Sequence, residues 1–307
     1  MLRTAMLAAS RSSAVRAMVE RGPTAAVVDR FVAGAGVDDA VVAARRIAAD
    51  RLVTIDRLGE DTTDRASADA TAAAYIVLLG RLRADGLTDR VEVSVKLSAL
   101  GQRLPEDADR IALDSARQVC AAAEAAGTTV TVDMEDHTTT DSTLAIVREL
   151  RADFPWVGAV VQAQLRRTEA DCRELAGSGS RVRLCKGAYD EPASVAFRRR
   201  SDVDRSFVRC LTVLMAGHGL PMVATHDPRL IEIARFLAGR AGRGPAGFEL
   251  QMLYGVRPRA QTELAADGLR VRVYVPYGTE WFGYFMRRLG ERPANLAFFV
   301  RSLVSRG

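Results

Sequence analysis

Four polar residues near the carboxyl end of the chain have the spacing of one helix face. They are Tyr284, Arg287, Arg288 and Glu291, at relative positions i, i+3, i+4 and i+7. Two adjacent guanidinium groups with one carboxylate leave a positive charge unneutralised, and like charges about 4 Å apart repel by about 4 kcal/mol at an effective dielectric constant of about 20. A bound anion would relieve this repulsion, so we expect an anion-binding face; the alternative is an ordinary solvated basic surface.

The opposite side of the same segment is apolar, which predicts that the helix is fixed to a hydrophobic core. Phe282, Phe285, Met286 and Leu289 lie on this side. An amphipathic helix buries its apolar stripe and leaves the polar one accessible. The direction in which the two arginines point is therefore set by the core beneath them.

Length and composition favour one large domain that covers residues 1–307. No Pro-, Gly- or Ser-rich linker divides the 307 residues, and a chain of this size buries roughly 75% of its unfolded surface. No apolar run approaches the ~20 residues of a membrane-spanning helix. The four cysteines, Cys120, Cys172, Cys185 and Cys210, form no C-x-x-C pair, which is typical of reduced thiols in a cytoplasmic protein.

The charge distribution argues against a nucleic-acid-binding protein. The net charge is only +5, and acidic residues are interleaved with basic ones. The densest basic run, Arg198 to Arg200, is followed by Asp202 and Asp204, and we interpret it as a solvated helix end. The amino-terminal stretch lacks acids before Glu20; we interpret it as an amphipathic helix, with a transit peptide as the alternative.

Eight short β-branched or apolar runs alternate with Ala/Leu/Arg-rich helical patterns. They are Leu52 to Leu58, Val91 to Leu97, Thr128 to Met134, Val157 to Ala163, Arg181 to Lys186, Pro221 to His226, Phe248 to Leu253 and Leu269 to Val275. Eight parallel strands, each followed by a helix, close a (β/α)8 barrel in a chain of this length. We expect an α/β fold of this TIM-barrel class, with residues up to about 50 as additional N-terminal helices.

Polar residues occur at the ends of nearly all the predicted strands. They are Lys96, Asp133, Glu135, Gln162, Lys186, Thr225, His226, Gln251 and Tyr274. In a parallel barrel the carboxyl ends of all strands meet at one mouth, where the active sites of this architecture lie. Strand ends also meet solvent, which tolerates polar residues without any function. The combination of a lysine, an acid, an amide and a histidine favours a shared cavity.

The segment from Arg181 to Tyr189 places a charged residue inside a strand. Period-2 alternation sends Arg183 and Cys185 to one face and Leu184 to the other. A charge in that position needs a partner, which Asp133 could supply, and the guanidinium could donate hydrogen bonds to an electron-rich ring. Gly187 would let a ligand approach the backbone closely, although a simple turn explains it equally well.

The run Thr225-His226-Asp227-Pro228 indicates a strand end followed by a helix start, with Asp227 as N-cap. Such a start suits a phosphate group. Dinucleotide, Walker, G-x-S-x-G and H-E-x-x-H motifs are missing, and with three histidines in the chain we expect no metal site. The residues alone therefore predict a barrel enzyme that binds an anionic small molecule and a phosphate-bearing cofactor.

Seven segments in succession resemble the monofunctional bacterial proline dehydrogenases. They are VSVKLSAL, TVDMEDH, GAVVQAQLRR, RLCKGAY, ATHD, FELQMLYG and VPYGTEWFGYFMRRLGERPAN, and together they span almost the whole chain. The resemblance implies a distorted (β/α)8 barrel that uses FAD to oxidise L-proline to Δ1-pyrroline-5-carboxylate, the first step of proline catabolism, and passes the electrons to a membrane quinone.

The resemblance also implies roles for individual residues. Asp133 and Arg183 would be catalytic, Arg183 beside the flavin and Asp133 as its support. The substrate-binding set would be Lys96, Arg287, Arg288, Tyr274, Tyr284 and Leu253, in which the three cations grip the proline carboxylate. The cofactor-binding set would be Met134, Gln162, Arg183, Lys186, Gly187, Ala188, Thr225, His226 and Glu291, the last as an acid that orders the arginine helix.

The chain departs from the family pattern at two positions near these residues. Cys185 stands where the family usually has valine, and a buried cysteine behaves as a small hydrophobe. Gly290 stands where alanine is common, which would weaken the arginine helix by about 1 kcal/mol.

Two alternative functions remain open from the sequence. A hydroxyproline dehydrogenase is the nearer one, and the bulky Tyr274 argues against it. The other is a cofactor-free barrel that binds anionic metabolites. The basic surface and the amino-terminal helices permit peripheral contact with the inner face of the cytoplasmic membrane, the alternative being that these helices pack against the barrel.

Overall fold

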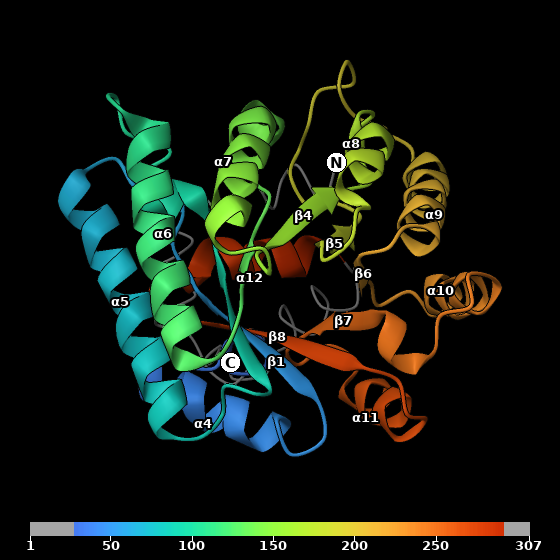
Figure 1. Cartoon of the computed structure of the whole chain (residues 1–307), viewed down its shortest axis with the longest axis horizontal. Helices are drawn as coiled ribbons and strands as arrows, with labels where there is room; N and C mark the ends of the chain where they lie inside the picture. Colours follow the sequence, from blue (N-terminus) through green and yellow to red (C-terminus); the bar gives the residue numbers. More distant parts are fainter. Residues whose placement is uncertain (1–27, 292–307) are drawn as a thin grey trace, which may run out of the picture.

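Eight parallel strands form a closed barrel at the centre of the molecule (Figure 1). The computed structural model describes residues 28–291, with side chains up to Met286. The strands are β1 (Leu52–Arg57), β2 (Val91–Val95), β3 (Val130–Val132), β4 (Gly158–Gln162), β5 (Arg181–Cys185), β6 (Leu220–Ala224), β7 (Glu249–Leu253) and β8 (Val271–Tyr277). Their spatial order follows the chain, and β1 pairs with both β2 and β8, which closes the barrel.

All eight predicted strands are confirmed, with differences at their ends. β3 has only three residues, whereas β8 continues through Pro276 to Tyr277. Parallel barrel strands are buried on both faces and therefore read as nearly continuous apolar runs. This is why the runs could be found in the sequence although polar residues such as Thr54 and Glu92 point into the barrel.

Helices surround the barrel and shield its outer face (Figure 1). They are α4 (Val37–Ile47), α5 (Arg65–Ala84), α6 (Ala108–Ala126), α7 (Thr140–Asp153), α8 (Thr168–Leu175), α9 (Arg200–Ala216), α10 (Pro228–Arg240), α11 (Pro258–Ala266) and α12 (Trp281–Glu291), with short 3-10 turns η1 (Leu97–Leu100), η2 (His137–Thr139) and η3 (Pro245–Gly247). Two apolar clusters fill the space between strands and helices, one along β8 and β1 to β4 and one along β4 to β8. Of the predicted N-terminal helices, α4 lies in the described part and packs against β1 and β8.

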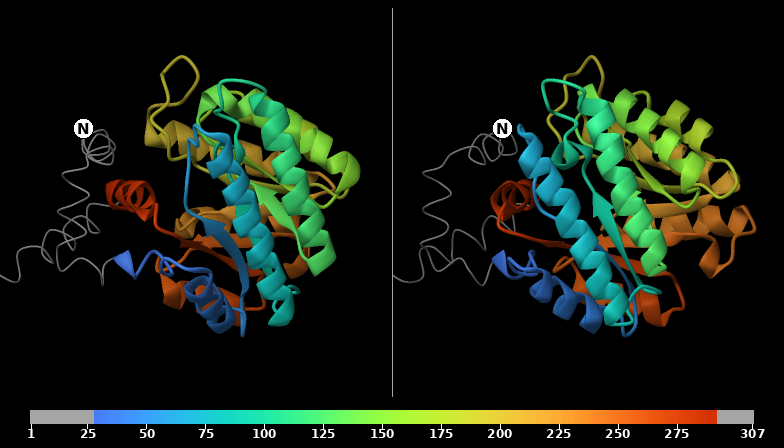
Figure 2. Two further views of the ribbon diagram at one scale, coloured as in Figure 1. Left: turned by 90° about the vertical axis from the view of Figure 1, so that its left-hand side faces the viewer. Right: turned by 60° about the vertical axis from the view of Figure 1, so that its left-hand side comes forward.

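Helix α12 lies across one end of the barrel rather than along its wall (Figure 2). Phe282, Phe285 and Met286 are buried in a third apolar cluster with Phe31 and Leu58. Leu58 directly follows β1, so the helix lies at the carboxyl-terminal end of the strands. The predicted apolar side of this helix is confirmed for these three residues, and the buried Tyr284 contributes to the same cluster.

Within residues 28–291, no helix combines the length and the apolar character needed to cross a bilayer.

Candidate active site

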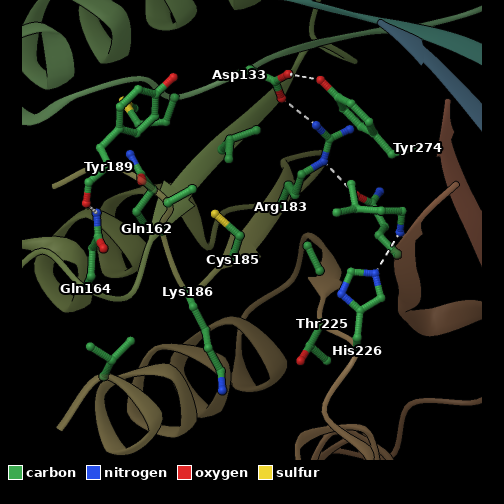
Figure 3. Close-up of a pocket in the computed structure, with 18 of the residues that line it drawn as sticks. Asp133, Gln162, Gln164, Arg183, Cys185, Lys186, Tyr189, Thr225, His226 and Tyr274 are labelled. Atoms are coloured by element: carbon green, nitrogen blue, oxygen red, sulfur yellow. Dashed lines mark hydrogen bonds and ion pairs between the residues drawn. The ribbon is translucent and has the colours of Figure 1, made fainter. Parts of the chain in front are cut away.

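The carboxyl ends of the strands surround a cavity of about 530 Å³. Thirteen of the predicted site residues line it: Lys96, Asp133, Met134, Gln162, Arg183, Lys186, Gly187, Ala188, Thr225, His226, Leu253, Tyr274 and Tyr284. They come from β2 through β8 or from the segments that follow these strands, and from α12. Figure 3 shows several of these side chains facing the same space. Barrel closure thus brings together residues that are far apart in the sequence.

Arg183 crosses the interior of the barrel from the middle of β5. The alternation predicted for this strand is confirmed, since Arg183 and Cys185 face the cavity and Leu184 lies in the outer core. The guanidinium donates from Nη1 to Asp133 Oδ1 over 2.5 Å (Figure 3). The same nitrogen donates to Ser94 Oγ over 3.1 Å. Its Nε donates to Gln251 Oε1 over 2.6 Å. The predicted pairing of Arg183 with Asp133 is therefore confirmed.

One nitrogen of Arg183 has no hydrogen-bond partner although it is buried. This atom is Nη2, which lies 3.8 Å from Glu92 Oε1, beyond hydrogen-bonding distance. A buried guanidinium donor without an acceptor costs free energy. Such an atom at the wall of a cavity is suited to an acceptor supplied by a ligand.

Asp133 has both carboxylate oxygens occupied. Oδ1 accepts from Arg183, and Oδ2 accepts from the hydroxyl of Tyr274 over 2.7 Å. Burial raises the pKa of Tyr274 well above its usual value, and the nearby Asp133 and Asp56 raise it further. Tyr274 therefore stays protonated and acts as a donor. Its ring also faces the guanidinium of Arg183, with the guanidinium carbon 5.3 Å from the ring centroid.

Lys96 projects from the end of β2 and is bound by Asp56, which was not among the predicted site residues. Its ammonium lies 2.8 and 2.7 Å from the two oxygens of Asp56 and 3.8 Å from Asp133 Oδ2. Burial by itself lowers the pKa of Lys96, but the charges of Asp56 and Asp133 outweigh it and raise the pKa above its ordinary value. Lys96 thus keeps its positive charge inside the cavity wall.

Asp56 follows the same strand-end rule as the predicted site residues, although it was not among them. Asp56 is near the end of β1, so the rule that collected the other strand-end residues also applies to it. Burial raises the pKa of Asp56, while Lys96 opposes that rise. A fully buried carboxylate of this kind needs its cation, which explains why Asp56 and Lys96 occur together.

The other end of the cavity carries Lys186 and the start of helix α10. Lys186 Nζ lies 2.6 Å from Asp204 Oδ1 and 3.5 Å from Asp227 Oδ2. Asp227 is the N-cap of α10, and Pro228 is in its first turn, as predicted. The hydroxyl of Thr225 accepts from the backbone N–H of Asp227 over 3.1 Å. This end of the cavity therefore combines a cation with a helix N-terminus.

His226 is held in one tautomer by the backbone. Its Nε2 accepts from the N–H of Leu253 over 2.9 Å (Figure 3). Because a neutral imidazole that accepts at one nitrogen carries its proton on the other, the proton is on Nδ1. Arg257 additionally donates to the carbonyl of His226 over 2.7 Å.

Gln162 and Glu135 connect the ends of β4 and β3. Gln162 Nε2 donates to the backbone carbonyl of Glu135 over 2.5 Å. The carboxylate of Glu135 accepts from the hydroxyl and the backbone N–H of Ser98 over 2.6 and 3.1 Å. Burial raises the pKa of Glu135 to about 7, although the hydrogen bonds from Ser98 oppose the rise.

The basic run at residues 198–200 is a solvated helix end, as predicted, since all three arginines are exposed. Arg200 begins helix α9. However, Arg198 and Arg200 also line the cavity. The run follows the segment after β5, and its place beside the cavity could not be predicted from charge spacing alone.

Arg287, Arg288 and Glu291 are the remaining predicted site residues. Helix α12 includes their positions, but their side chains lie outside the described residues.

The sequence model of the proline dehydrogenase family matches residues 41–301 of the chain. Proline dehydrogenase 1 of Bacillus subtilis is 36% identical over 307 residues, which is the full length of both chains. Proline dehydrogenase of Deinococcus radiodurans is 39% identical over 282 residues, with 91% of this chain and 90% of the relative covered. The chain belongs to the proline dehydrogenase family.

Solved structures support the barrel architecture of this proline dehydrogenase family member. Proline utilization A from Bdellovibrio bacteriovorus, inactivated by N-propargylglycine, gives a TM-score of 0.77 at 24% identity and covers 85% of this chain. A Bradyrhizobium japonicum proline utilization A variant gives 0.75 at 24% identity and covers 94%. The chain spans about a third of those two proteins, 32% and 33% of their length.

Membership of the proline dehydrogenase family implies a flavin cofactor, and the residues present fit one. An isoalloxazine ring has acceptor atoms along one edge, which match the unpartnered donor of Arg183 and the amide of Gln162. Met134, Val160 and Ala224 add apolar surface to the cavity. Lys186 and the N-terminus of α10 suit a phosphate. Among residues 28–291, His, Cys, Asp and Glu form no group of three that could hold a metal ion.

Proposed function

We propose that the protein oxidises L-proline to Δ1-pyrroline-5-carboxylate with FAD as the immediate electron acceptor. The proposal rests mainly on the composition of one cavity in this member of the proline dehydrogenase family. The cavity is lined by the buried ammonium of Lys96, the guanidinium of Arg183, and Lys186 beside a helix N-terminus. Residues 1–307 would act as a single domain.

The amino-acid carboxylate would be held by cations at the barrel mouth. Lys96 is charged, buried and directed into the cavity, and Arg287 and Arg288 of helix α12 would complete the clamp. Leu253, Tyr274 and Tyr284 would form the walls around the proline ring. Fixing the carboxylate fixes the distance and direction of the ring carbon that reacts.

FAD would lie along the cavity between Arg183 and the start of α10. When bound, the flavin accepts a hydride from C5 of the neutral-amine form of proline. Arg183 and Gln162 would face the ring system, and Met134 would pack on it. Lys186, Gly187, Ala188, Thr225 and His226 would contact the ribityl and phosphate region, and Glu291 would order the arginine helix beside it.

Arg183 would stabilise negative charge, and Asp133 would position Arg183. A guanidinium held in a dry cavity stabilises charge that develops nearby without reorganising. Both oxygens of Asp133 already accept a hydrogen bond, from Arg183 and Tyr274. A group in this state orients its partners and is poorly placed to remove a proton.

Electrons would pass from the reduced cofactor to a membrane quinone. We propose that the protein is cytoplasmic and contacts the inner face of the cytoplasmic membrane peripherally, which its net charge of +5 would assist.

An absorption spectrum tests the proposal. Purified protein reconstituted with FAD should absorb at about 450 nm, and anaerobic L-proline should bleach this band. A colourless protein would favour a cofactor-free barrel. Faster bleaching by hydroxyproline than by proline would favour a hydroxyproline dehydrogenase.

A further inference from the structure

An acidic residue that takes no part in the proposed chemistry is linked to Arg183 through a single side chain. Glu249 begins β7 and is fully buried, and Gln251, two residues later, is 4% exposed. Because alternate residues of a strand face the same side, Glu249 and Gln251 both point into the barrel, whereas Leu250 lies in the outer core. The two side chains form a column from the barrel interior to the cavity, which Gln251 lines.

The hydrogen bonds of Gln251 allow its amide one orientation. Gln251 Nε2 donates to Glu249 Oε1 over 2.7 Å, and Gln251 Oε1 accepts from Arg183 Nε over 2.6 Å. An ionised carboxylate only accepts hydrogen bonds, and a guanidinium only donates them. A reversed amide would place acceptor against acceptor and donor against donor. Glu249 thereby keeps the carbonyl oxygen of Gln251 turned toward Arg183.

Glu249 is itself held in place from the other side of the barrel interior. Arg272 of β8 donates from Nε to Glu249 Oε1 over 2.7 Å and from Nη2 to Glu249 Oε2 over 3.2 Å. Arg272 is buried as well, and its Nη1 donates to the carbonyl of Val53 over 2.7 Å. The column therefore starts from a two-bond ion pair that is anchored to the backbone.

We propose that Glu249 is a positioning residue for Arg183 and acts through the amide of Gln251. This inference rests on the proposed function, in which Arg183 lies beside FAD. Asp133 and Ser94 hold Nη1 of the guanidinium, and Gln251 holds Nε. Two separate nitrogens are thus fixed, which sets the plane of the group. Without the acceptor at Nε, the guanidinium is free to turn about the Nη1 contacts.

The variant Glu249→Gln tests the positioning role of Glu249. It keeps the size of the side chain and replaces the carboxylate, which only accepts hydrogen bonds, by an amide. FAD-loaded protein is reduced anaerobically by proline, and the flavin midpoint potential is measured. We expect the limiting reduction rate to fall about tenfold or more, while the dissociation constant of proline stays within about twofold. We also expect a lower midpoint potential, because a displaced Arg183 stabilises the reduced flavin less.

The midpoint potential separates positioning from a simple charge effect. Loss of a nearby negative charge alone would raise the potential, since it favours the electron-rich flavin. A raised potential, or a rate and potential equal to those of the parent protein, would overturn the proposal. Leu250→Ala, at the neighbouring outward-facing position of β7, measures how far reduced stability alone changes the same readouts.

Exchanging the side chains at positions 249 and 251 should restore the reduction rate that Glu249→Gln loses. The double variant Glu249→Gln/Gln251→Glu contains the same groups in swapped positions. Its carboxylate at position 251 accepts from Arg183, while the amide at position 249 can face both Arg272 and that carboxylate. We expect this variant to recover most of the lost rate; a rate as low as that of the single variant contradicts the proposal.

A second single variant covers the case in which Glu249→Gln does not fold. Glu249→Asp then replaces it, since aspartate keeps the charge opposite Arg272 but shortens the reach to Gln251. We expect the same fall in the reduction rate, and a parental rate in that variant is the contradicting result.

The parent protein distinguishes this inference from the proposed function. If proline fails to bleach the FAD of the parent protein, the proposed function is wrong. If proline bleaches the parent and Glu249→Gln alike, only the positioning role is wrong.

Discussion

Asp133 and Lys96 have different roles at the barrel mouth. Asp133 has one partner on each oxygen, Arg183 and Tyr274, so it connects two groups of the cavity wall. Lys96 has a dedicated counter-charge in Asp56, which is nearly inaccessible to solvent. A charged group with a buried partner keeps its charge at any physiological pH, and this is what a carboxylate-binding cation requires.

The chain contains two lysines among its 43 basic residues, and both line the cavity. We predict that Lys96→Met weakens proline binding by about 10- to 100-fold, because a hydrogen bond to a charged group contributes about 1.5–3 kcal/mol. FAD affinity should change little. Lys186→Met should have the opposite pattern, with weaker FAD binding and a smaller effect on proline.

Two titrations measure this pair of variants. FAD binding is followed by flavin fluorescence, and proline binding by the rate of anaerobic flavin reduction. Each variant is the control for the other. Equal losses of proline and FAD affinity in both would contradict the assignment of Lys96 and Lys186 to different ends of the cavity.

Glu135 gives the protein a pH-dependent stability. Its pKa rises from 4.5 to about 7 on folding because of burial. Below pH 4.5 the carboxyl is protonated in both states, so the folded state contains no buried charge at this position. Between pH 4.5 and 7 the unfolded state loses this proton while the folded state still holds it, so stability falls by about 3 kcal/mol over that range and is constant above it.

We therefore expect Glu135→Gln to flatten the decrease in stability between pH 4.5 and about 7. Urea denaturation at several pH values, compared between the two proteins, measures the difference. The same slope in both proteins would show that Glu135 ionises as easily in the folded state as in the unfolded one.

The elements could be predicted from the sequence because each follows a local rule. Strands buried on both faces gave eight apolar runs, and the apolar arc of Phe282, Phe285 and Met286 gave helix α12 and its buried side. Asp56 was not predicted as a site residue because the run from Leu52 to Leu58 was interpreted only as a strand. The place of Arg198 and Arg200 at the cavity was not predicted because it depends on the path of the long segment after β5, which no local pattern encodes.

Gly187 supports the turn from β5 into this loop. Its φ is +102°, and a Cβ there would collide with the side chain of Gln164. We predict that Gly187→Ala destabilises the protein by about 1–3 kcal/mol and reduces FAD retention, because the backbone that lines the cavity must shift.

Gly80→Ala is the matched control. Gly80 lies inside helix α5, and an added Cβ there would meet nothing within 4 Å. Alanine should stabilise this helix by about 0.5–1 kcal/mol. Thermal unfolding of both variants measures the comparison. A Gly187→Ala protein that is as stable as the parent would mean that the turn has room for a side chain.

The whole molecule assembles its site by closing a barrel. Lys96 and Tyr274 are 178 positions apart in the chain, yet Lys96 Nζ lies 3.5 Å from the hydroxyl of Tyr274. Strand count and strand-end residues predicted that such groups would share one mouth. They could not predict which groups pair, since pairing depends on the register of neighbouring strands and on side-chain length.

A ligand bound inside a barrel stabilises the entire fold. We predict that FAD raises the thermal midpoint of the apoprotein, with about 2.7 kcal/mol of added stability when free FAD is about 100 times its dissociation constant. Removing FAD should reverse the gain. Differential scanning calorimetry over a series of FAD concentrations measures this, and a midpoint that does not depend on FAD would contradict cofactor binding to the native barrel.

The central claim is that one barrel mouth holds both the flavin and the amino-acid carboxylate. A crystal structure of the protein with FAD and an unreactive analogue of proline, in which oxygen replaces the ring nitrogen, tests it most directly. We predict that the carboxylate of the analogue lies within hydrogen-bonding distance of Lys96 Nζ, with the flavin ring against Arg183 and Gln162. A carboxylate bound away from Lys96, or a flavin bound outside this cavity, would contradict the account.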